Sequence, residues 1–186
     1  VFQQSNPVAE AECFVLFSAV ANCAEGNFVR YMQVIEPHLL KALGDAENYH
    51  VCCVAIGLVG DISRAIEKQL MNNGLCDKIV KALLELLENE NLDRSVKPPV
   101  LGAFGDIGLG IGSEVNRYLM PIMSMMVQAS QAVYDPNDVD EDTIDFFMEM
   151  RQYILETYCG ILQGLSDENG SPQPFLPYLQ SIFQFF

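Results

Sequence analysis

The stretch Val51–Ala65, VCCVAIGLVGDISRA, decides the fold because a second copy of it follows in the chain. The later stretch, Val96–Gly110, reads VKPPVLGAFGDIGLG, and both contain a Gly-Asp-Ile triplet. Asp61 of the first copy and Asp106 of the second lie 45 residues apart. A repeat of about 40–47 residues that holds two or three helices is typical of HEAT and armadillo solenoids. The sequence therefore predicts an all-α chain of stacked helical pairs.

Apolar residues recur at spacings of three and four along most of the chain, which is the pattern of helices that bury one face. Gly26-Asn27 is expected to end the first helix, since glycine commonly follows a helix end. One pair alone cannot bury its apolar faces, whereas stacked pairs can. We predict a single HEAT-repeat array over 1–186, with about three complete pairs and one partial pair: 8–43, 47–88 and 94–133, an acidic loop over 134–142, and a partial fourth repeat over 143–186.

The charge balance limits the kinds of partner. The 186 residues include 25 acidic and 10 basic ones, for a net charge of −15. Such a charge repels nucleic acid and anionic membranes and favours basic partners. We also expect no apolar stretch of the ~18 residues that a membrane span needs. Neither nucleic acid nor membrane is therefore expected as a partner. The chain lacks an initial Met and ends within an apolar pattern at Phe185-Phe186, and we interpret it as part of a longer protein.

Metal and cofactor sites are not expected. The six cysteines form no C-x-x-C pair and lie among apolar residues, as in a protein of a reducing compartment. The segment Asp138–Glu149 imitates a calcium-binding EF-hand loop, but Thr143 occupies the position where the sharp turn needs glycine. We interpret Asp142 or Thr143 instead as the residue that caps the following helix.

A catalytic site is not expected either. Asp61 and Asp106 lie on otherwise apolar helices, without a histidine, serine or second carboxylate at a convincing spacing. We interpret both as structural aspartates that accept hydrogen bonds from a neighbouring turn or, in the case of Asp61, pair with Arg64. The sequence therefore predicts a binding protein and not an enzyme.

Five glycines crowd one predicted helix, from Gly102 to Gly112. Each costs roughly 1 kcal/mol relative to alanine in a helix interior. A phosphate-binding loop is the sharper alternative, but the run follows no strand, contains no basic residue and lacks the G-x-G-x-x-G spacing. We expect the glycines to allow close approach between neighbouring helices.

Two longer stretches carry a family resemblance. Tyr49–Ala65 (YHVCCVAIGLVGDISRA) and Arg94–Gly112 (RSVKPPVLGAFGDIGLGIG) closely resemble segments of the importin beta family of nuclear import receptors. The resemblance implies a right-handed superhelix with the first helices of the pairs on the convex face and the second helices on the concave face. It also implies a protein of the cytoplasm and nucleus that acts at the pore of the nuclear envelope.

The resemblance implies three partners. The concave face would hold the basic segment of the adaptor importin alpha or of a cargo, slots between outer helices would hold phenylalanine-glycine (FG) repeats of nucleoporins, and Ran in its GTP form would release the cargo. No cofactor is implied, because the nucleotide belongs to Ran. A fragment with cut ends is also expected to self-associate.

Candidate residues follow from the predicted helices. The carboxylates expected to face the concave groove are those on second helices: Glu36, Asp77, Glu85 and Glu88. Glu114 and the acidic loop are further candidates. Phe14, Phe17 and Phe104 lie on first helices, where they are either core residues or the walls of an FG slot. The alternative function is a HEAT-repeat scaffold or adaptor subunit of another complex.

Overall fold

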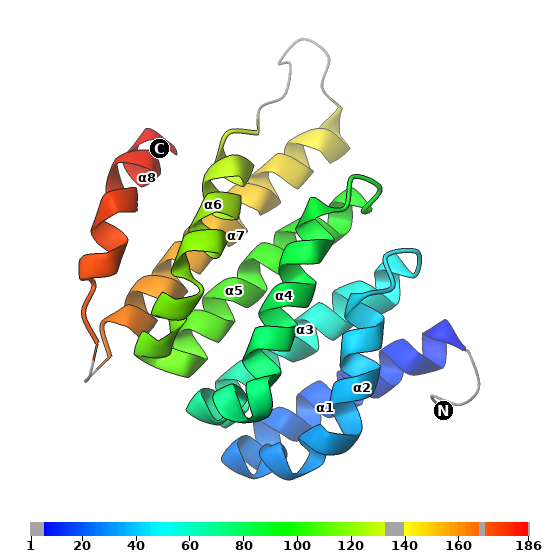
Figure 1. Ribbon diagram of the computed structural model, residues 1–186. Coiled ribbons are helices and arrows are strands. Elements are labelled where there is room, and N and C mark those ends of the chain that lie inside the picture. The colour runs from blue at the N-terminus through cyan, green and yellow to red at the C-terminus, as the bar shows by residue number, and fades with distance from the viewer. Residues whose placement is uncertain (1–5, 133–139, 168–169, 186) are drawn as a thin grey trace.

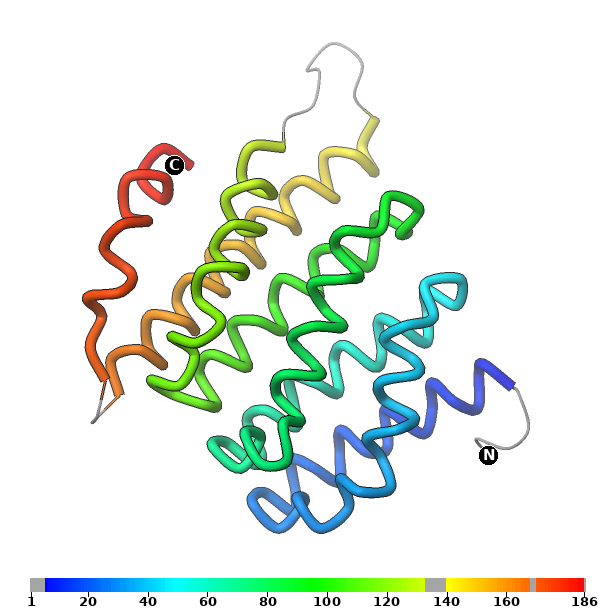
Figure 2. The backbone as a smooth tube through the Cα atoms, viewed as in Figure 1, coloured from blue at the N-terminus to red at the C-terminus, as the bar shows by residue number. Residues whose placement is uncertain are grey.

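The computed structural model describes residues 6–132, 140–167 and 170–185, and this part of the chain is helical without strands. The helices form two layers (Figure 1, Figure 2). The first layer consists of α1 (Pro7–Ala24), α3 (Tyr49–Ile66), α5 (Lys97–Ile111) and α7 (Glu141–Leu165). The second consists of α2 (Met32–Leu43), α4 (Leu75–Glu88), α6 (Leu119–Ser130) and α8 (Leu179–Phe185). The predicted acidic loop falls mostly outside the described residues.

Short 3₁₀ segments carry the chain from the first to the second helix of each pair: η1 (Glu25–Tyr31), η2 (Glu67–Gly74), η4 (Gly112–Arg117) and η5 (Gln173–Tyr178). A further one, η3 (Arg94–Val96), precedes α5. The first three begin with positive φ angles of 47° at Glu25, 49° at Glu67 and 65° at Gly112. Because positive φ is incompatible with a right-handed helix, each first helix stops there. Glu25, and not the expected Gly26, ends α1.

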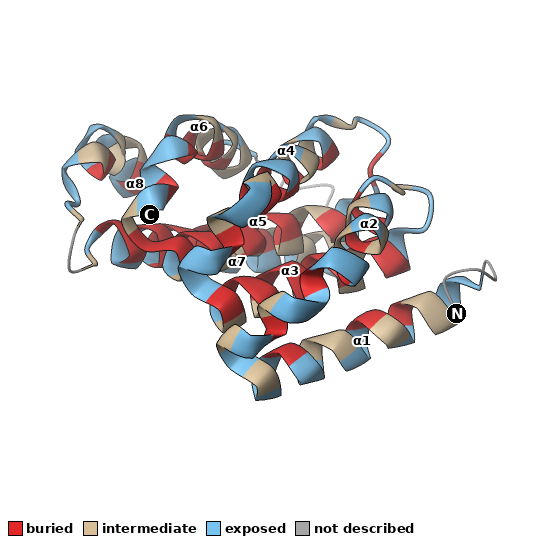
Figure 3. Ribbon diagram, turned by 60° about the horizontal axis from the view of Figure 1, so that its bottom comes forward, coloured by how far each residue is buried: buried red, intermediate tan, exposed pale blue. Residues whose placement is uncertain are grey.

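The apolar core lies between the two layers, where the buried residues of Figure 3 are concentrated. Its largest fully buried aromatic side chains are Phe14, Phe28 and Phe104. These come from α1, η1 and α5, so one core runs through successive pairs instead of dividing into separate cores. This continuity is the physical signature of a solenoid, in which each pair is stabilised by its neighbours.

Glycines set the spacing of the first layer. A Cβ atom on Gly105 would lie 2.8 Å from the Cα of Thr157, and one on Gly108 would lie 3.1 Å from the Cα of Ile161. From the opposite side, α7 brings Gly160 against the carbonyl oxygen of Gly105. The backbones of α5 and α7 therefore almost touch, as expected for the glycine-rich run. The packing gained by this approach offsets the helix propensity that the glycines lose.

The start of α7 differs from the sequence interpretation. Its N-cap is Asp140, whose side chain accepts a hydrogen bond of 2.7 Å from the backbone N–H of Thr143. The prediction of Asp142 or Thr143 as the cap was therefore wrong, and Asp142 lies in the first helical turn. Of the EF-hand-like segment, Asp138 falls outside the described residues. No cluster of metal-ligating side chains occurs in the part of the chain that the structure describes.

Two helical stretches, Pro7–Leu43 and Tyr49–Glu88, are long and apolar enough to cross a membrane by length and composition alone. The expectation that no stretch meets this criterion was wrong, because a span tolerates a few charged residues. Each stretch is a first and a second helix joined at a 3₁₀ turn. The most apolar window of the second stretch is 56% buried, as in a core helix, whereas that of the first is 17% buried.

Candidate ligand-binding faces

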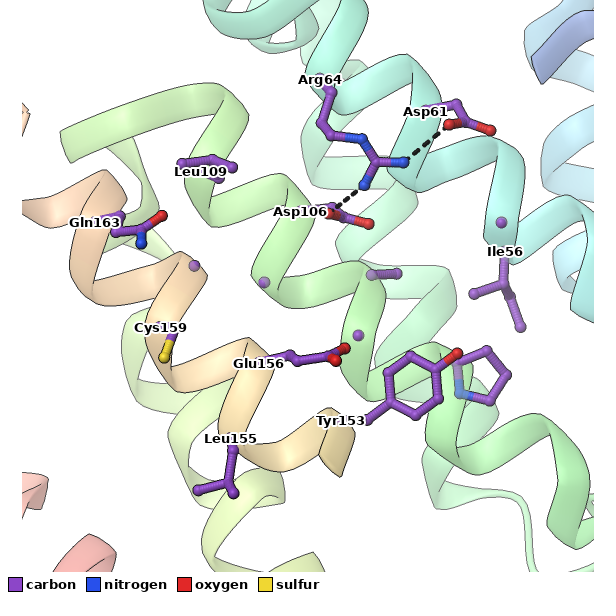
Figure 4. Close-up of a pocket in the computed structure, with 16 residues that line it drawn as sticks. Ile56, Asp61, Arg64, Asp106, Leu109, Tyr153, Leu155, Glu156, Cys159 and Gln163 are labelled. Atoms are coloured by element: carbon purple, nitrogen blue, oxygen red, sulfur yellow. Dashed lines mark hydrogen bonds and ion pairs between the residues drawn. The ribbon is translucent and has the colours of Figure 1, made fainter. Parts of the chain in front are cut away.

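A groove of about 650 Å³ opens on the first layer, along the exposed side of α3, α5 and α7. We call it the first-helix groove (Figure 4). Its apolar walls come from all three helices: Ile56, Pro99, Leu109, Tyr153 and Leu155. It is open beside Gly57, where a Cβ would meet no atom within 4 Å. A volume of this size lies within the range of sites that bind small ligands or side chains of a partner.

A line of polar side chains crosses the groove's upper end in Figure 4. Arg64 pairs with Asp61 at 2.8 Å within α3 and also with Asp106 on α5. Asn22 of α1 donates a hydrogen bond of 3.1 Å to Asp61. Asp61 and Asp106 thus connect three neighbouring first helices, and pairing with Arg64 is the one of the two expected roles that Asp61 shows.

The pKa of Arg64 reflects these contacts. Burial lowers it, but the hydrogen bonds and charges of Asp106 and Asp61 outweigh burial and raise the pKa above its ordinary value. The guanidinium therefore stays charged and keeps both carboxylates engaged as hydrogen-bond acceptors. This arrangement fits the structural role expected of the two aspartates.

The α7 side of the groove carries a second acidic group. Glu156 extends toward α5 in Figure 4 and accepts a hydrogen bond of 2.9 Å from the amide of Gln152. Near it, burial raises the pKa of Tyr153, and the negative charges of Glu149, Glu156 and Asp106 raise it further. The groove therefore joins apolar walls to a negative electrostatic potential.

The predicted phenylalanines do not line this groove. Phe14 and Phe104 are 0% exposed because they share the helix face that forms the core. Of the two roles expected for them, core residue or slot wall, both therefore have the core role in this conformation. Phe17 is partly buried and packs against the core from α1.

The sequence reasoning missed Tyr153, Leu109 and Ile56 as groove residues. The signal available was Gly57, an exposed glycine on an otherwise apolar helix.

The second layer has its own hollow, of about 340 Å³, between α4 and α6. We call it the second-helix hollow. It is lined by both apolar and acidic residues: Asp77, Val80, Lys81, Leu84, Glu85, Glu88, Tyr118 and Pro121. Three of the four predicted carboxylates are therefore brought together, and the fourth, Glu36, lies on α2. Glu114 lies in η4.

Several of these carboxylates already have partners. The hydroxyl of Tyr118 donates a hydrogen bond of 2.6 Å to Asp77. Burial raises the pKa of Tyr118, and that hydrogen bond raises it further. Asp77 therefore joins α4 to the segment before α6, and one of its carboxylate oxygens already accepts a hydrogen bond within the fold.

Two lysines of α4 lie beside the other acidic groups. Lys78 forms a salt bridge of 2.6 Å with Glu36 across the gap between α4 and α2. Lys81 lies 3.6 Å from Glu85, one helical turn away. All four of these side chains are at least partly exposed, so each pair contributes little to stability and can exchange partners.

A family model described as "Importin subunit beta-1-like, TPR repeats" matches residues 2–186. The importin subunit beta-1 of Arabidopsis thaliana is 35% identical over 185 residues, covering 100% of this chain and 21% of the relative. A crystal structure of importin beta superposes with a TM-score of 0.89 at 32% identity, over 98% of this chain and 21% of that one. These matches confirm the HEAT-repeat α-solenoid and the resemblance inferred from the sequence.

Two solved complexes are similar as well. A Kap95:Nup1 complex matches with a TM-score of 0.85 at 32% identity, over 96% of this chain and 20% of that one. A structure of Kap95p with RanGDP, in which the switch loops of Ran adopt the GTP-bound conformation, matches with a TM-score of 0.82 at 32% identity, over 95% and 20%. The chain spans about a fifth of the length of these relatives. It belongs to the importin subunit beta-1-like family.

Proposed function

We propose that the chain is a partner-binding part of a nuclear import receptor and that the first-helix groove holds phenylalanine side chains of nucleoporin FG repeats. The observation that carries this proposal is the groove itself, which is open, apolar-walled and built on three adjacent first helices. Burial of an aromatic side chain there would remove apolar surface from water on both partners. The similarity to Kap95 in its complex with Nup1 supports the same kind of ligand.

The second-helix face is proposed to bind the basic segment of importin alpha or of a cargo. The second-helix hollow offers apolar contacts beside Glu85 and Glu88. Each exposed ion pair is worth about 0–1 kcal/mol, so affinity would come from several pairs together with apolar anchors. Ran in its GTP form is proposed to release the cargo, which the similarity to the Ran complex of Kap95p supports.

These partners define where the protein would act and what it would not do. We propose that it shuttles between cytoplasm and nucleus and works at the pore of the nuclear envelope. It is proposed to bind its partners without catalysing a reaction, and without a resident cofactor, nucleic acid or membrane. The paired roles of Asp61 and Asp106 support this, since both carboxylates are used to hold helices together.

The groove proposal can be tested with Gly57→Leu. Because a side chain at Gly57 meets open space, leucine would fill part of the groove without disturbing the helices. Binding of a fluorescent Phe-Gly-repeat peptide, measured by anisotropy, should weaken at least several-fold. Ala19→Leu adds the same side chain to an exposed position on α1 and should leave binding unchanged. Equal binding by both variants and the original protein would contradict the proposal.

The basic-ligand proposal needs a separate pair of variants. Glu85→Lys with Glu88→Lys should weaken anisotropy-detected binding of a lysine- and arginine-rich helical peptide, and the loss should shrink with added salt. The control is a double variant that changes the net charge by the same amount at other exposed positions, Glu12→Lys with Glu141→Lys. If both double variants lose affinity equally, the second-helix hollow is not the binding site.

We also propose that the chain by itself associates end to end. Leu16 and Val20 on α1 are 59% and 37% exposed, and Phe183 on α8 is 72% exposed. Sedimentation velocity should show a concentration-dependent dimer, which Leu16→Lys should weaken because it places a charge in the contact. A monomer at all concentrations would contradict this.

A further inference from the structure

The first-helix groove has more negative than positive charge. Its lining includes Asp61, Asp106 and Glu156 but only one cationic side chain, that of Arg64. Arg64 is held by both aspartates at once, so its charge is already compensated within the protein. The groove therefore keeps an excess negative charge that a ligand can meet.

Glu156 is the carboxylate most available to a ligand. It is exposed on α7, and its side chain extends over the groove toward α5 in Figure 4. The hydrogen bond that it accepts comes from the neutral amide of Gln152. Among the described residues, no lysine or arginine forms a salt bridge with it. The side chain of Glu156 is thus held by a neighbour on the same helix, but its negative charge is not neutralised.

The charge of Glu156 affects the pKa of Tyr153, the aromatic residue in the wall of the groove. The pKa of Tyr153 is raised by burial and, in addition, by Glu149, Glu156 and Asp106. Three carboxylates therefore act together at the place where an aromatic ligand would lie against Tyr153 and Leu155. A ligand of purely apolar character would gain nothing from this potential, whereas a nearby cation would gain from it.

We propose that the first-helix groove selects aromatic residues that have a lysine or arginine next to them in the sequence. The aromatic ring contacts the apolar walls, and the cation faces Glu156 with further attraction from Asp106. This inference rests on the proposed binding of phenylalanine in the same groove, and it adds the charge of the ligand as a determinant of specificity.

The test uses three peptides that share one Phe-Gly core and differ only in the residue beside the phenylalanine, which is Lys, Gln or Glu. Affinities are measured by fluorescence anisotropy at 50 mM and 300 mM salt, on the whole chain. The Lys peptide should bind about two- to fivefold more tightly than the Gln peptide at low salt, and the Glu peptide more weakly than either. The difference should narrow at high salt, because exposed charges are screened.

Glu156→Gln is the decisive variant because it removes the charge and keeps the shape. It should reduce the ratio of the affinity for the Lys peptide to the affinity for the Gln peptide. Glu12→Gln makes the same change on the exposed side of α1 and should leave the preference intact. If both variants change the preference equally, the preference belongs to the net charge of the whole chain and the inference is overturned.

Two other outcomes separate this inference from the function on which it rests. If the three peptides bind equally well and Gly57→Leu weakens all of them, phenylalanine binding stands and the role of the flanking charge is overturned. If none of the peptides binds at millimolar concentration, the proposed function of the groove fails, and the inference fails with it.

Discussion

Glycine has two different roles at neighbouring positions of the first layer. Gly57 faces open space on α3 and helps to leave the first-helix groove hollow. Gly105 faces the backbone of Thr157 at a separation that no Cβ atom tolerates. The same residue type therefore costs helix stability while leaving open space at one position and permits helix contact at the other.

This contrast predicts opposite effects of the same substitution. Gly57→Ala should stabilise the protein by about 0.5–1 kcal/mol, because alanine favours the helix and meets no neighbour. Gly105→Ala should destabilise it by about 1–3 kcal/mol, because α7 has to move away. Urea unfolding followed by circular dichroism measures both values. Destabilisation by Gly57→Ala would contradict the open space described beside Gly57 on α3. Tolerance of Gly105→Ala would contradict the packing described for α5 and α7.

At the level of elements, the turns after α1, α3 and α5 repeat the same backbone geometry with different residues. Glu25, Glu67 and Gly112 all have positive φ, at intervals of 42 and 45 residues. These intervals exceed the 34 residues of a TPR unit and agree with HEAT repeats. Only the third turn uses glycine, so the first two hold an L-residue in a conformation that costs of the order of 1–3 kcal/mol.

Glu67→Gly should therefore stabilise the protein by about 1 kcal/mol, since relief of strain exceeds the entropy that glycine adds to the unfolded chain. Glu67→Ala is the matched control, because it removes the exposed side chain and retains the strain. Thermal unfolding by calorimetry would compare the two. If glycine proves no better than alanine, the turn is not strained by its backbone angle.

At the scale of the whole molecule, one continuous core buries thiols and a tyrosine hydroxyl. Burial raises the pKa of Cys52 to about 12 and that of Cys76 to about 11, compared with an ordinary value of 9.0. Burial also raises the pKa of Tyr118. In each case the folded state retains a proton that the unfolded chain releases at a lower pH, so alkaline conditions favour unfolding.

The stabilising contribution of the two thiols should be fully present below about pH 9 and should be lost as the pH rises toward 11–12. The urea concentration at the midpoint of unfolding should be lower at pH 10.5 than at pH 8. Cys76→Ala should lower stability at both pH values but reduce the difference between them, whereas Cys23→Ala, at an exposed position, should change neither. An unchanged pH dependence in Cys76→Ala would show that this thiol does not remain protonated in the fold.

The fold was more predictable than the binding surfaces. Helical pairs could be predicted from the repeat around Asp61 and Asp106 and from the spacing of apolar residues. A helix that buries one face carries apolar residues three and four positions apart, which is visible in the local sequence. The same pattern could not separate Phe104, which lies in the core, from an exposed wall residue. The groove depends on side chains that come together from α3, α5 and α7, such as Ile56 and Tyr153, and no local spacing encodes that meeting.

A methyl NMR titration of the chain with a Phe-Gly-repeat peptide tests directly whether phenylalanine binds in the first-helix groove. We expect shifts of the methyl groups of Leu109 and Leu155, which line the first-helix groove, with those of Val80 and Leu84 in the second-helix hollow unmoved. Shifts confined to Val80 and Leu84, or none at saturating peptide, would contradict the assignment of phenylalanine binding to the first-helix groove.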